Sequence, residues 1–164
     1  MGYSTHFAGT LTVTPPLNEH ERGYLADFAQ TRQTSPDRGQ LVVESTSIGY
    51  VSSYFSGNTP QGNKPEIWCH WVPDEAGNLV WNEAEKTHAH EQWLTWLIEH
   101  LLGPASRDFV QQRLGEDPRL EHFTHDHIIN GIVDAQGDDP DDMWRIRVTE
   151  NTVEVQHPEI TYPD

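Results

Sequence analysis

The sequence predicts an α+β domain, a single antiparallel sheet with two main helices packed on one face. Three observations lead to this prediction: one stretch with the apolar spacing of an amphipathic helix, short stretches that alternate apolar and polar residues as half-buried strands do, and tight turns between consecutive strands. The expected order is strand, helix, two strands, helix and three strands. It fits a split β-α-β, or ferredoxin-like, arrangement with extra C-terminal strands.

The stretch from 90 to 104 is expected to form the central helix. One apolar stripe recurs along it at helical spacing, formed by Trp93, Leu94, Trp96, Leu97, Ile98 and Leu101. Thr87 offers an N-cap, and Gly103 followed by Pro104 is a common stop signal. Each large side chain in the stripe contributes roughly 1.5–3 kcal/mol when buried, so this helix should organise the core.

The chain before this helix begins with a strand at 6–14, which alternates apolar and polar residues and ends at Pro15 and Pro16. Asn18 and Glu21 then have the spacing of a capping box, which starts a helix running to about residue 31.

The other expected elements have weaker signals in the sequence. Residues 32–65 are rich in Pro and Gly and are interpreted as a loop or hairpin insertion within a single domain, 1–164. The remaining predictions are a hairpin of strands at 66–73 and 78–81, a short helix after Ser106, strands at 128–133, 143–149 and 152–156, and a terminal edge strand at Ile160 and Tyr162.

The charge balance limits the classes of partner. Ten basic residues stand against 26 acidic ones, a net charge of −16, which disfavours direct binding of nucleic acid or of a membrane through a basic face. The acidity has two interpretations, a charge that keeps the protein soluble or an array of carboxylates that imitates DNA phosphates. The single cysteine, Cys69, the absence of a signal-peptide pattern and the absence of a long apolar run favour a cytoplasmic protein.

Histidines supply one candidate site. His122, His125 and His127 fall within six residues, and on an extended strand His125 and His127 would point to the same side. Imidazoles grouped in this way suit Zn or Mn, the ions that this site would take as a cofactor. The alternative is that all three are ordinary surface or partly buried histidines.

Tryptophans supply a second candidate site. Of the six, Trp68, Trp71 and Trp81 fall on the expected hairpin, and Trp68 and Trp71 should face opposite sides because they are three residues apart. A tryptophan on the outer sheet face could anchor a protein partner. The alternative is that these rings pack in the core.

Four segments resemble a family of small uncharacterised proteins from actinobacteria, other bacteria and their phages. The segments are MGYSTHFAGTLTVTPPL at 1–17, WCHWVPDEAGNLVWNEAEK at 68–86, EQWLTWLIEHLLGP at 91–104 and INGIVDAQGDDPDDMWRIRVTENTVEV at 129–155. The opening and the QGDDPDD turn are the most specific parts. The resemblance implies one compact domain of bacterial or phage origin, and it implies no activity or catalytic residue because the family has none assigned.

The leading functional hypothesis is a small acidic protein, from a phage or mobile element, that binds a host protein without catalysing a reaction. It is expected to be a monomer or a homodimer. The sequence shows no coherent active site. Cys69 and His70 cannot form a nucleophile–base pair, because neighbouring residues on a strand face opposite sides of the sheet. A metal-dependent hydrolase or nucleotide-processing enzyme using His122, His125 and His127 is the first alternative, and a DNA-mimic inhibitor is the second.

Overall fold

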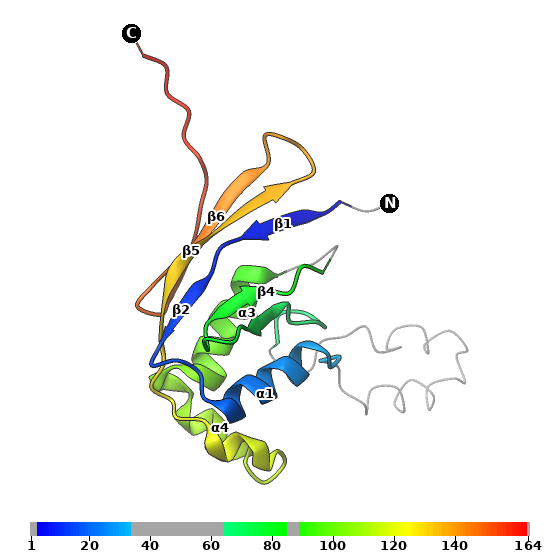
Figure 1. Ribbon diagram of the computed structural model, residues 1–164, viewed down its shortest axis with the longest axis vertical. Helices are drawn as coiled ribbons and strands as arrows, with labels where there is room; N and C mark the ends of the chain where they lie inside the picture. The colour runs from blue at the N-terminus through cyan, green and yellow to red at the C-terminus, as the bar shows by residue number, and fades with distance from the viewer. Residues whose placement is uncertain (1–2, 34–63, 85–88, 164) are drawn as a thin grey trace, which may run out of the picture.

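The computed structural model describes residues 3–33, 64–84 and 89–163, and these form the expected α+β architecture, with helices gathered on one side of a sheet (Figure 1). Seven strands and three α-helices lie in these ranges. In chain order they are β1 Thr5–Ala8, β2 Leu11–Thr14, α1 Glu19–Ala29, β3 Trp71–Pro73, β4 Leu79–Trp81, α3 His90–Leu97, α4 Arg107–Arg113, β5 Ile128–Gly137, β6 Met143–Thr149 and β7 Thr152–Gln156.

The sheet has the strand order β3-β4-β2-β5-β6-β7, and β1 also pairs with β5. β1 and β2 lie against β5 in one continuous register, from Thr5 opposite Gly137 to Thr14 opposite Ile128. They therefore act as one long strand with an interruption at Gly9, where φ is +136° and a Cβ would lie 2.5 Å from a backbone oxygen of β5. The strand predicted at 6–14 therefore corresponds to β1 and β2 together.

The ferredoxin-like order expected from the sequence is not evident among the described strands. Every described pairing is antiparallel, as expected, and the sheet has seven strands. The third α-helix in the described ranges, α4, is the short helix expected after Ser106.

One face of the sheet forms the core and the other faces solvent. The inward side chains, all buried, are Phe7, Leu11, Val13, Leu79, Ile129, Val133, Ala135, Ile146 and Val148. Their neighbours along β2, β5 and β6 are mostly polar and exposed. This alternation, which comes directly from the sequence, places the helices on one side and leaves an open outer face.

The central helix is present and fully packed. All six residues of its apolar stripe are buried. The last turn, Ile98–Leu102, widens into a π-helical turn, in which the Gly103 N–H donates to the Ile98 carbonyl at 2.8 Å. The helix begins after Ala89, whereas the expected N-cap, Thr87, lies outside the described residues.

Helix α1 confirms the predicted capping box. The Glu21 N–H donates to Asn18 Oδ1 at 2.8 Å, and the Asn18 N–H donates to Glu21 Oε1 at 2.9 Å. Most of the insertion predicted at 32–65 lies outside the described residues.

The terminal edge strand predicted at Ile160 and Tyr162 is wrong. Both side chains are largely exposed, at 77% and 87%, and residues 157–163 pair with no described strand. Pro158 follows β7 closely and has no N–H to donate, so the ladder ends there. No helix in the described ranges is long and apolar enough to cross a lipid bilayer.

Candidate functional site

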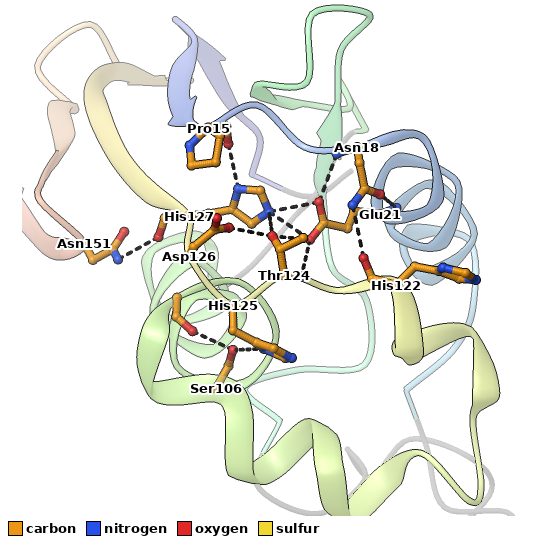
Figure 2. A network of polar contacts seen from close by, with 11 residues as sticks. Pro15, Asn18, Glu21, Ser106, His122, Thr124, His125, Asp126, His127 and Asn151 are labelled. Carbon is orange, nitrogen blue, oxygen red and sulfur yellow. Dashed lines mark hydrogen bonds and ion pairs between the residues drawn. The ribbon is translucent and has the colours of Figure 1, made fainter.

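A buried network of polar groups joins the start of α1 to the chain just before β5 (Figure 2). At its centre Glu21 and His127 are 0% and 1% exposed, and His127 Nε2 lies 2.8 Å from Glu21 Oε2. The Thr124 N–H donates to the same carboxylate oxygen at 3.2 Å. On the other side of the ring, His127 Nδ1 lies 2.6 Å from the Pro15 carbonyl oxygen.

The partners of His127 determine its protonation state. A carbonyl oxygen and a carboxylate are both acceptors, so both ring nitrogens must carry hydrogens for both contacts to be hydrogen bonds. Burial by itself would lower the pKa of His127, but the hydrogen bond to Glu21, the charges of Glu21 and Asp126 and the contact with the Pro15 carbonyl together outweigh it, and the pKa is raised. Burial would likewise raise the pKa of Glu21, but hydrogen bonds from His127 and from the Asn18 and Thr124 N–H groups, together with the charge of His127, outweigh it, and the pKa is lowered. The pair is therefore an ion pair inside the protein.

The pair predicts a defined pH dependence of stability. The depressed pKa of Glu21 means that its contribution is present above the ordinary value of 4.5 and is lost as the pH falls through the lower folded value. The raised pKa of His127 means that its contribution is complete below 6.5 and is lost as the pH rises through the higher folded value. In denaturant titrations, the stability difference between the native chain and a Glu21→Gln variant should be largest between about pH 4.5 and 6.5. A difference that does not vary with pH would contradict the ion pair.

His125 lies next to this network but belongs to a different one. Its backbone is left-handed, with φ of +58°, and its Nδ1 lies 2.8 Å from Ser106 Oγ. The Ser106 hydroxyl donates to the Gly103 carbonyl at 2.6 Å, so it accepts from His125. Burial, assisted by Arg107, lowers the pKa of His125. Ser106 is fully buried and its proton is committed to a carbonyl, so this pair offers no accessible nucleophile.

His122 faces the surface in a third environment. Its ring stacks on His20 with centroids 3.8 Å apart, and its Nε2 lies 3.3 Å from Glu121 Oε1. The structure therefore does not bring His122, His125 and His127 together, because the left-handed residue turns the chain where an extended strand was assumed. Within the described ranges, no three His, Cys, Asp or Glu side chains are grouped so that they could hold the expected Zn or Mn.

The three candidate tryptophans also occupy separate environments. Trp68 is 38% exposed, whereas Trp71 is buried and its Nε1 donates to the His90 carbonyl at 2.9 Å. Trp81 is half-buried and packs edge-on against His6 and Phe7. Only Trp68 therefore offers an exposed ring, and it lies outside the strands.

The cysteine that lies between Trp68 and β3 does not have a reactive thiol. Cys69 is 1% exposed, and burial raises the pKa of its thiol to about 12. A thiol held in its protonated form is a poor nucleophile and a poor metal ligand.

Sequence reasoning missed two grooves, each of which is lined in part by residues of β7. The first, which we call the outer groove, has a volume of about 510 Å³ on the open face of the sheet and is lined in part by His6, Ala8, Gln136, Met143, Trp144 and Pro158. The second, which we call the edge groove, has a volume of about 350 Å³ between α3 and β7 and is lined in part by Glu91, Thr95, Glu99, Val153, Glu154 and Val155. Met143 and Val155 are large apolar side chains with 47% and 37% exposure. Their exposure follows from the strand order, which the sequence does not specify.

Comparisons with protein-family models, with curated protein sequences and with solved structures found no match to this chain. The resemblance described above therefore stays a hypothesis.

Proposed function

We propose that this protein is a non-enzymatic binding factor, of phage or mobile-element origin, that binds a host protein through the β7 side of its sheet. The observation that carries this proposal is that the edge strand β7 contributes residues to both grooves, Gln156 to the outer groove and Val153, Glu154 and Val155 to the edge groove. Exposed apolar side chains lie beside both grooves. Apolar anchors set in grooves with a polar rim are typical of protein interfaces.

The chemistry of the buried networks supports binding rather than catalysis. Glu21, His127 and Ser106 are closed to solvent, so a reactant has no access to them in this conformation. The side chains that line the two grooves include carboxylates, imidazoles and amides. Such a surface suits recognition of another protein, and the net charge of −16 favours a partner with a basic surface.

The test is a reconstituted complex. Proteins retained from a bacterial lysate are identified, produced in pure form and titrated against this chain by calorimetry. Replacing Val155 or Met143 by aspartate should weaken the complex about tenfold or more, since a buried apolar anchor commonly contributes over 1.4 kcal/mol.

Ile132→Asp is the matched control. Ile132 is 36% exposed, nearly the same as Val155, and lies on the open face of the same sheet without lining either groove. Equal loss in all three variants, or no complex that reassembles from pure components, would contradict the proposal. Retention of the chain by DNA-binding proteins with DNA as a salt-sensitive competitor would instead favour DNA mimicry, and near-stoichiometric bound Zn or Mn would favour the metal-dependent enzyme.

A further inference from the structure

We infer that β7 accepts an extended, basic segment of the partner as an additional strand of the sheet. This inference rests on the proposed function and specifies how the partner binds. It is built from the edge of β7, from the carboxylates beside it and from the charge of the whole chain.

The edge of β7 is suited to strand addition. β7 pairs with β6 over five residues, from Thr152 opposite Thr149 to Gln156 opposite Arg145. In the described part of the chain, no strand pairs with its other edge. An edge strand presents a row of backbone N–H and C=O groups that an extended peptide can pair with.

The side chains at this edge select the partner segment. Val153 and Val155 lie opposite Val148 and Ile146, so they share the inner face with α3, whereas Glu154 points to the other face. Glu91 on α3 and Glu99 on the π-helical turn that follows it line the edge groove together with Val155 and Glu154. An added strand would place alternate side chains on the two faces of the sheet. Glu154 lies beside one of these faces, and Glu91 and Glu99 lie beside the other.

This arrangement favours cationic residues separated by small or β-branched apolar ones. In such an alternation the lysine or arginine side chains lie on one face of the added strand, where they can meet Glu154. β-Branched residues fit the strand conformation and can cover Val155.

The same charges disfavour a second copy of this chain as the occupant. Glu154 is the middle residue of β7, so two copies pairing antiparallel about it would place Glu154 directly opposite its equivalent. Like charges directly opposite each other destabilise a strand pair. Each chain also carries a net charge of −16, and β7 itself contains no basic residue.

The experiment is a hydrogen-exchange titration of the full ¹⁵N-labelled chain by NMR. The probe is a capped seven-residue peptide that alternates lysine and valine, and its control has the same sequence with every backbone nitrogen methylated. At saturation the first peptide should slow exchange of those β7 amides that do not bond to β6 by about tenfold or more. The methylated peptide, which keeps the charges but has no backbone donors, should not slow them.

A pair of charge-reversal variants tests the carboxylates. Glu154→Lys should weaken binding of the lysine–valine peptide about threefold or more, as expected for loss of an exposed charge contact. Glu75→Lys, on the exposed β3–β4 turn at the opposite edge of the sheet, changes the net charge by the same amount and should leave binding nearly unchanged.

Each of the following outcomes would overturn strand addition by a basic segment. Equal effects of the two peptides would show contact by charge alone, and no effect of either would show that β7 does not take such a strand. Protection of β7 that rises with protein concentration without any peptide would show that a second copy fills the edge. A host complex that is lost in Met143→Asp while β7 stays unprotected would leave the proposed function standing and this inference wrong, whereas failure of both assays would remove both.

Discussion

Replacing His127 by alanine is expected to lower the free energy of unfolding by about 3–5 kcal/mol. The variant leaves the Glu21 carboxylate buried without its ionic partner, and it also removes the hydrogen bond to the Pro15 carbonyl. An unpaired charge inside a protein costs more than the pair contributed. Urea titration at about pH 6, where both partners are charged, measures the effect.

His122→Ala is the control for this prediction. His122 lies five residues away in the chain and is exposed, so its replacement should change stability by no more than about 0.5 kcal/mol. A double variant that replaces both Glu21 and His127 by leucine should lose less than the two single losses added together, because no lone charge remains. Equal losses in His122→Ala and His127→Ala would show that the buried pair has no special role.

Trp93→Ala should also cost about 3–5 kcal/mol, because it empties the centre of the core. Trp93 is 0% exposed and contacts Phe28 of α1 edge-on with ring centroids 5.7 Å apart. The variant therefore separates α3 from α1 as well as leaving a cavity. Thr95→Ala, on the exposed side of the same helix, should change stability by no more than about 0.5 kcal/mol.

A phenylalanine at the same position separates volume from polarity. The Nε1 hydrogen of Trp93 is buried and has no hydrogen-bond acceptor within the described residues. An unsatisfied buried donor costs about 1–3 kcal/mol, so Trp93→Phe removes this cost while losing only part of the ring. We expect Trp93→Phe to lose much less stability than Trp93→Ala in thermal and denaturant unfolding. Equal losses of stability in the two variants would show that the buried indole N–H does not destabilise the protein.

The sequence alone determined the elements whose signals are local. The capping box at Asn18 and Glu21 needs only two residues three apart, and it starts α1 as predicted. The β6 and β7 boundaries were also predicted correctly, since alternation marks both strands and Glu150 and Asn151 form the turn between them with positive φ. Helical spacing similarly identified the buried stripe of α3.

The candidate site depended on contacts between distant parts of the chain. From the sequence, Glu21 is expected only to be part of the capping box. Nothing near it in the sequence shows that it will be buried against His127, 106 positions later. The alternation before β5 gave no sign that His125 adopts a left-handed backbone, which is what separates it from His127. In both cases the local pattern did not fix the direction of the side chain, because that direction depends on the backbone conformation and on distant partners.

The order of the strands likewise required the tertiary structure. Alternation shows that a strand has one buried face, but it carries no information about which strand lies beside it, because backbone pairing is the same for any sequence. The sequence therefore gave no reason to place β7 at an edge where it lines two grooves. The local chemistry determined what each element is, and only the packing of the chain decided which side chains meet, which charges are buried and which strand is left open.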